Sequence, residues 1–223
     1  MMKRHAWKMA AAMAVGLLCA GVAGAVDLQE LVKETQQTHN VESKITFVWW
    51  IPQEYWEASL ASNPNMDPKE KADFLGALEA YQVVAVAYVK TGLSGFTEIS
   101  PETDLLTHLH FSSGGKQLDP VPDDKVVPGA RAILAALKPL LAGMIGQLGQ
   151  GMHFIVYPGR DGANRLVDPN KSGAFQFSVY DQDFKWRLPL ASLLPRKFDP
   201  KSNEDFPGNF DYNPYTGDKL KVR

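Results

Sequence analysis

Three histidines carry the side chains in this sequence that are best suited to bind a transition metal. His108 and His110 are separated by one residue, and residues two apart in a strand face the same side. Two adjacent imidazoles provide half of a metal site, and His153, on another expected strand, would supply a third ligand. The spacing therefore indicates a candidate divalent-metal site formed by these histidines.

A metal at this site would point to a metal-dependent hydrolase. The metal would activate a water molecule, and a carboxylate such as Glu54 or Glu57 would act as the general base. The same alternation has a plainer interpretation, because Leu109 and Phe111 take the opposite face and leave the histidine pair on the polar side. A solvated pair with no cofactor is the interpretation that we favour.

A second candidate site lies in the stretch FVWWIPQEYW. In a regular strand Trp49 and Trp50 point to opposite faces, so their rings cannot form one flat platform. Pro52 fits the first turn of a helix that would carry Trp56 back over the sheet. We expect mostly core packing here, with Trp50, Glu54 and Trp56 as candidate ligand-binding residues at the mouth of a pocket. A glycan-binding module that uses Trp50 and Trp56 is an alternative function.

The C-terminal segment contains a short motif related to metal-binding turns. Residues 212–217 read YNPYTG, which resembles the Cys-Pro-x-x-Gly knuckle of zinc ribbons with Asn213 in place of Cys. Residues 198–202, FDPKS, echo the same pattern. Because the thiols are missing, the resemblance implies a tight turn of that shape and no zinc; a type I turn with Pro at its second position would have the same sequence.

The candidate residues must be positioned by a mixture of helices and strands. Asp67 and Pro68 give the clearest local signal, since Asp can cap a helix and Pro can occupy its first position. The apolar run of residues 83–89, VVAVAYV, predicts a central strand buried on both faces. Further helices are expected over residues 26–39 and 129–149, and further strands over 43–50, 95–99, 106–112, 153–157, 174–180 and 184–188.

These elements follow one another without strict alternation. The order predicts an α+β fold, with one domain over residues 26–195 that contains a mixed or mainly antiparallel sheet and several covering helices. Residues 196–223 are polar and rich in Pro, Gly, Asn and Asp, and we expect them to form an extended tail.

Residues 1–25 have the parts of a secretory signal peptide. A basic start is followed by a short apolar stretch and by small residues at the position that signal peptidase reads. We expect cleavage after Ala25 and export to the periplasm or out of the cell. The one cysteine, Cys19, lies in this leader, so the mature chain contains no thiol for catalysis, zinc or redox chemistry.

Charge and hydropathy exclude several classes of partner. The leader holds three of the 23 Lys and Arg residues and none of the 25 Asp and Glu residues, so the mature chain has a formal charge of −5. An acidic surface argues against binding nucleic acid or anionic membranes. The longest apolar segment is interrupted by Arg131, Lys138 and Pro139, which predicts a buried helix and no transmembrane span.

No P-loop, HExxH or GxSxG motif occurs in the sequence. We therefore expect an exported, non-catalytic module of the cell envelope that binds an unknown small molecule or an envelope protein. The hydrolase and the glycan-binding module remain the alternatives.

Overall fold

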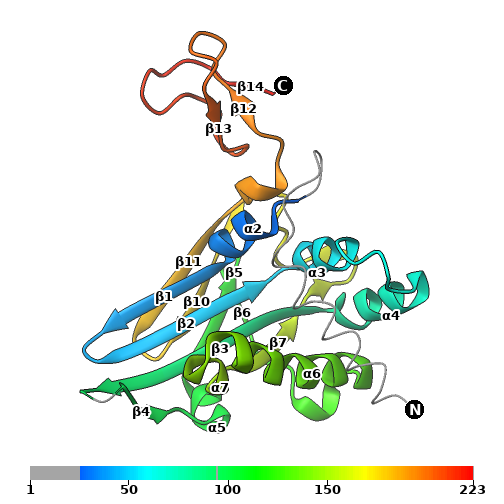
Figure 1. The fold of residues 1–223 in the computed structure, drawn as a ribbon, viewed down its shortest axis with the longest axis vertical. Helices are drawn as coiled ribbons and strands as arrows, with labels where there is room; N and C mark the ends of the chain where they lie inside the picture. The colour runs from blue at the N-terminus through cyan, green and yellow to red at the C-terminus, as the bar shows by residue number, and fades with distance from the viewer. Residues whose placement is uncertain (1–25, 94, 223) are drawn as a thin grey trace.

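The computed structural model describes residues 26–93 and 95–222, which form one α+β domain (Figure 1). Its central sheet is five-stranded and entirely antiparallel. The long strand β3 pairs with β2 along one edge, and its other edge is shared by β7 at residues 81–86 and β4 at residues 89–92. The strands are β1 (Gln36–Val41), β2 (Lys44–Ile51), β3 (Tyr81–Gly92), β4 (Gly95–Ile99) and β7 (His153–Pro158). The predicted α+β class is confirmed, and the predicted leader lies outside the described residues.

A second antiparallel sheet packs against one face of the first. Its strands follow the order β11 (Gln182–Leu188), β10 (Gly173–Val179), β5 (Leu109–Ser113) and β6 (Lys116–Leu118). Aromatic side chains join the two sheets, as where the Trp50 ring meets the Phe175 ring edge-on at a centroid distance of 4.6 Å. The residues of β3 from Gln82 to Val89 are all buried, which confirms the prediction of a strand covered on both faces.

Helices gather near the central sheet and extend beyond one end of β2 and β3 (Figure 1). The helices are α2 (Leu28–Thr35), α3 (Gln53–Ala61), α4 (Pro68–Leu78), α5 (Glu102–Leu105), α6 (Pro128–Ile145) and α7 (Gln147–Gln150), and short 3-10 turns span Leu106–His108, Asp123–Lys125 and Ala191–Leu193. Asp67 caps α4 as predicted, because its carboxylate accepts hydrogen bonds from the backbone N–H groups of Lys69 and Glu70. None of the helices in the described part of the chain has the length and hydrophobicity needed to cross a bilayer.

The prediction of a helix over residues 26–39 is correct for its first part and wrong for its second. Helix α2 ends at Thr35, and the next six residues form β1, which pairs with β2 through a tight turn at Glu42 and Ser43. The apolar residues that suggested a helix, such as Leu31, all precede the change. Beyond Thr35 the sequence has no helical stripe, and pairing with the edge of β2 decides its conformation.

Two small β-structures complete the fold. Strands β8 (Arg160–Asp161) and β9 (Asn164–Arg165) form a hairpin directly after β7. The C-terminal segment, expected to be extended, contains a three-stranded sheet in the order β13 (Asp205–Phe206), β12 (Lys197–Phe198) and β14 (Lys221–Val222). This small sheet is drawn at the top of Figure 1, beyond the ends of the main strands.

Candidate functional site

The two tryptophans expected beside a ligand are core residues. Trp50 is fully buried, and its indole N–H donates a hydrogen bond of 2.8 Å to the side-chain oxygen of Gln82. Trp56 is 2% exposed and packs against the rings of Tyr55 and Phe74. Neither ring is accessible to a sugar. The expectation of an aromatic edge at the mouth of a pocket is therefore wrong, and both side chains pack in the core. Alternation on β2 places Trp50 between the sheets, and α3 turns Trp56 inward.

His108 and His110 do not lie on one strand as predicted, although Leu109 and Phe111 are buried and both histidines are more exposed. The strand begins only at Leu109, because residues 106–108 form a 3-10 turn. His108 lies at the end of that turn, with Nδ1 at 2.9 Å from Thr107 Oγ1 and its ring stacked on Tyr180. His110 is exposed on β5. Within the described residues, these two histidines take part in no group that could hold a metal ion.

The third histidine has different neighbours. His153 Nδ1 lies 3.1 Å from Glu102 Oε2 and 3.5 Å from Lys138 Nζ. Glu102 and Lys138 also line a pocket of about 490 Å³ between α6 and β7, whose other walls are mostly apolar. Within the described residues, no group of three or more His, Cys, Asp or Glu side chains is arranged to hold a metal ion. The predicted ligand set His108, His110 and His153 is thus not assembled.

Glu54 is the predicted site residue that the structure does place beside a polar pocket. Its carboxylate accepts hydrogen bonds from Arg165 Nη1 at 2.6 Å and from Arg165 Nη2 at 3.1 Å. The Asn170 amide donates a third, at 2.9 Å. The Glu54 and Arg165 side chains are only 14% and 23% exposed, so this ion pair is partly shielded from water.

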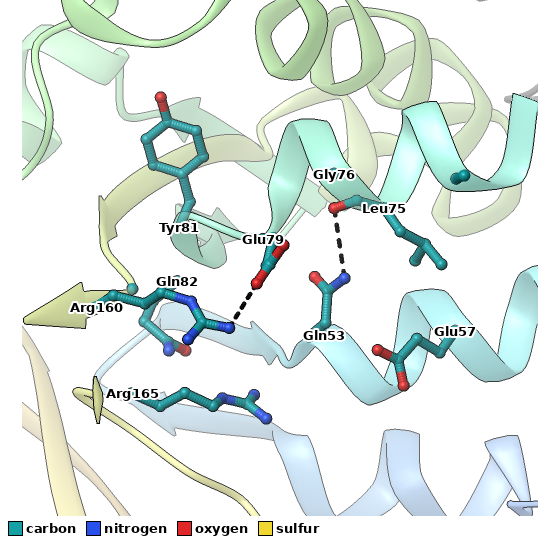
Figure 2. Close-up of a pocket in the computed structure, with 11 residues that line it drawn as sticks. Gln53, Glu57, Leu75, Gly76, Glu79, Tyr81, Gln82, Arg160 and Arg165 are labelled. Atoms are coloured by element: carbon teal, nitrogen blue, oxygen red, sulfur yellow. Dashed lines mark hydrogen bonds and ion pairs between the residues drawn. The ribbon is translucent and has the colours of Figure 1, made fainter. Parts of the chain in front are cut away.

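The pocket beyond this ion pair has a volume of about 350 Å³. It lies between α3, α4 and the β8–β9 hairpin, and Figure 2 shows Gln53 and Glu57 projecting into view from α3, with Arg160 and Arg165 on the opposite side. The lining residues are Gln53, Glu57, Ala72, Leu75, Gly76, Glu79, Tyr81, Gln82, Gly159, Arg160 and Arg165.

Backbone features in these elements leave room for the pocket and position its arginines. A Cβ at Gly159 would lie 2.9 Å from the backbone of Ala80, so only glycine permits this close approach of β7 to the start of β3. The hairpin that follows sets Arg160 directly opposite Arg165. On α4, Gly76 exposes its backbone to the pocket, and a Cβ there would meet no atom within 4 Å.

Carboxylates neutralise both arginines. Arg160 Nη2 lies 2.6 Å from Glu79 Oε1, and Arg165 is held by Glu54. Burial alone would lower the pKa of Arg165, but the hydrogen bond and the charge of Glu54 outweigh this and raise it. The positive charges of Arg160 and Arg165 face each other in the hairpin, and this arrangement is stabilised because Glu79 and Glu54 each pair with one of them.

Glu57 is the exception among the charged pocket residues. No hydrogen bond or ion pair of the described residues engages its carboxylate. Partial removal from water raises the pKa of Glu57, and the negative charge of Glu54 adds to the effect. The positive charge of Arg165 partly offsets these effects, and the Glu57 side chain is exposed to solvent. The pocket therefore has at its edge one carboxylate without a direct partner among the described residues.

Sequence reasoning found the acidic half of this site and missed the basic half. Glu54 and Glu57 drew attention because they follow the tryptophans, but Arg160 and Arg165 fall in the stretch PGRDGANR, which has the composition of an ordinary turn. One signal in the sequence could have indicated these residues. Two arginines at the two ends of a Gly-containing turn face each other in a hairpin, so each needs a carboxylate partner to offset the repulsion between their charges.

Comparison of the chain with family models, curated proteins and solved structures gives no match.

Proposed function

We propose that this is an exported, non-catalytic binding protein that holds a small polar molecule by a cationic group. The carrying observation is the Glu57 carboxylate, a solvent-exposed group that lines the pocket and makes no hydrogen bond or ion pair within the described residues. An ammonium or guanidinium group of a ligand would supply the missing positive charge, and a charge-assisted hydrogen bond of this kind is stronger than one between neutral groups.

The surrounding charges favour a cation over an anion. Both pocket arginines are occupied, Arg160 by Glu79 and Arg165 by Glu54, so an anionic ligand would have to compete with a carboxylate already in place. A cation would instead pair with Glu57, the lining carboxylate that no arginine engages directly, and by neutralising it would also relieve the repulsion between Glu57 and Glu54.

Size and lining favour a small hydrophilic molecule. A volume of about 350 Å³ is near the lower end of ligand pockets. Gln53 and Glu79 offer polar groups along the wall, and the aliphatic part of the lining is limited to residues such as Leu75. A compound with one amine and several hydroxyl or amide groups fits this description.

A binding role is also supported by how the carboxylates are used. Glu54, one of the two candidate general bases, is engaged by Arg165 and Asn170 and is not free to accept a proton from a substrate. Glu57, the other candidate, is the carboxylate that the proposal assigns to ligand binding. The described residues place no histidine in the lining of this pocket. The arrangement can hold and orient a ligand.

Thermal unfolding with matched compounds tests the proposal. Ethanolamine, putrescine and glucosamine are each compared with their uncharged counterparts ethylene glycol, butanediol and glucose. We expect at least one cationic compound to raise the Tm in a concentration-dependent way while its neutral counterpart does not. Glu57→Gln should abolish the increase, and Glu204→Gln, which removes an exposed carboxylate outside the pocket, should preserve it. Equal effects of charged and neutral compounds would refute the proposal.

A further inference from the structure

The C-terminal segment contains a turn in which a side chain caps its own backbone. The Asp199 carboxylate accepts a hydrogen bond from the Lys201 N–H at 2.8 Å, and the Asn203 N–H donates to the Asp199 carbonyl at 2.8 Å. Three residues after Asp199, the Ser202 hydroxyl oxygen accepts a hydrogen bond from the Glu204 N–H. The turn ends at Asn203, whose φ of 58° is in the left-handed region.

A second turn repeats this arrangement position by position. The Asn213 side-chain oxygen accepts hydrogen bonds from the N–H groups of Tyr215 and Thr216, and the Gly217 N–H donates to the Asn213 carbonyl at 2.8 Å. The Thr216 hydroxyl oxygen accepts a hydrogen bond from the Asp218 N–H. Gly217 has a φ of 76°, as Asn203 does at the equivalent place in the first turn. The sequence echo between the two segments is therefore also a structural repeat.

The two turns meet through their first residues. Asn213 Nδ2 donates a hydrogen bond of 2.6 Å to Asp199 Oδ2. Asp199 is 1% exposed and Asn213 is 2% exposed, so this bond is shielded from water. The hydrogen bond from Asn213 is the main reason that the pKa of Asp199 is lowered, which keeps the carboxylate charged and accepting.

In a zinc ribbon, two turns of this kind each present two ligands with two residues between them, and the metal ion joins the turns. Here the equivalent positions in the first turn are Asp199 and Ser202, and those in the second are Asn213 and Thr216. Each of these side chains already accepts a backbone N–H, as a metal ligand in such a turn commonly does. Where a zinc ribbon has its metal ion, the two turns are joined here by the hydrogen bond from the Asn213 amide to the Asp199 carboxylate.

We infer that residues 197–222 form a metal-ribbon framework in which the buried Asp199–Asn213 hydrogen bond takes the place of the metal ion. Strand β12 supports the arrangement by pairing with β13 on one side and with β14 on the other. The pairing of a carboxylate with an amide is essential, because two carboxylates at this distance would repel one another and a single hydrophobic replacement would leave the other group buried without a partner. If the framework is that of a metal ribbon, thiolates placed at Asp199, Ser202, Asn213 and Thr216 should restore a metal site.

The first experiment restores the thiolates in the full mature chain. The variant D199C/S202C/N213C/T216C is titrated with Co²⁺, whose absorption spectrum distinguishes tetrahedral thiolate coordination. We expect one equivalent of Co²⁺ to bind with the intense visible bands of a tetrahedral site, and Zn²⁺ to displace it. The control D199C/S202C, which carries thiols in one turn only, should not form this site. A folded quadruple variant without the tetrahedral spectrum would overturn the inference.

The second experiment uses oxygen and nitrogen side chains only and remains informative if the quadruple variant fails to fold. Trypsin cleavage after Lys201 reports opening of the first turn. Asn213→Asp should accelerate cleavage at least tenfold at neutral pH, and D199N/N213D, which exchanges donor and acceptor, should restore the wild-type rate. EDTA should leave the wild-type rate unchanged. An exchange variant as sensitive as Asn213→Asp, or a wild-type tail opened by EDTA, would overturn the inference.

Discussion

The Arg165 guanidinium donates two hydrogen bonds to the Glu54 carboxylate, from Nη1 at 2.6 Å and from Nη2 at 3.1 Å. This paired geometry orients the guanidinium more strictly than a single contact would. It connects α3 to β9 across 111 positions of the sequence and fixes one wall of the pocket. It also satisfies Glu54, which leaves Glu57 as the pocket carboxylate available to a ligand.

Glu54→Gln should destabilise the fold. The substitution removes the charge that compensates the partly buried guanidinium of Arg165. Loss of a hydrogen-bonded charged partner costs about 1–3 kcal/mol, and the free energy of unfolding measured in urea should fall by that amount. The control Glu204→Gln should change it by less than about 0.5 kcal/mol, as is usual for an exposed site. Equal stability of the two variants would show that the ion pair contributes nothing to the fold.

Glu57→Gln should instead stabilise the protein without ligand at neutral pH. The pKa of Glu57 is raised, first by partial removal from water and then by Glu54. The folded protein therefore binds this proton more tightly than the unfolded chain does, and the resulting stability is complete below the unfolded-state pKa and is lost as the pH rises through the folded-state pKa. The advantage of the Gln variant should appear across that interval and shrink in more acidic solution. Urea unfolding at a series of pH values measures it, and a Gln variant that is less stable at neutral pH would contradict the prediction.

Gly76 allows the pocket to be filled without harm to the fold. A Cβ at this position meets nothing within 4 Å, and Gly76 lies inside α4. Gly76→Ala should raise the free energy of unfolding by about 0.5–1 kcal/mol, the usual difference between Gly and Ala in a helix. Gly76→Met should be at least as stable as the wild type but should lose the Tm response to cationic compounds, because its side chain occupies the pocket. If Gly76→Met binds them normally, the ligand does not occupy this pocket.

The Trp50 indole should contribute to the stability of the fold through its hydrogen bond to Gln82 as well as through its packing. Trp50→Phe leaves the buried side-chain oxygen of Gln82 without its donor, at a cost of about 1–3 kcal/mol beyond the packing loss. Trp56→Phe is the matched control, since Trp56 is equally buried and no hydrogen bond is described for its indole N–H. Urea unfolding compares the two variants. A Trp50→Phe variant no less stable than Trp56→Phe would show that the bond to Gln82 is unimportant.

Local signals in the sequence were sufficient for much of the fold. The Asp67–Pro68 pair predicted the start of α4, and the apolar run at 83–89 predicted the buried central strand. Alternation also placed Trp49 and Trp50 on opposite faces, where Trp49 donates to Thr35 beside the helices and Trp50 packs under the second sheet. These outcomes depend on neighbouring residues, which is why the sequence reveals them.

The functional residues depend on contacts between distant segments. A 3-10 turn before Leu109 separates His108 from the strand that carries His110, and the alternating pattern gave no sign of it. The pairing of Glu54 with Arg165 requires α3 and a hairpin more than a hundred residues later to be adjacent. The bond between Asp199 and Asn213 likewise forms only when two separate turns meet.

The most direct test of the proposed function is a ¹H–¹⁵N NMR titration of the protein with ethanolamine, putrescine and glucosamine, each beside its uncharged counterpart. We predict that at least one cationic compound shifts amide signals from the pocket segments of α3, α4 and the β8–β9 hairpin and that its neutral counterpart does not. Glu57→Gln should remove the shifts. Shifts of the same size with the neutral counterpart, or undiminished shifts in the Gln variant, would contradict the proposed function.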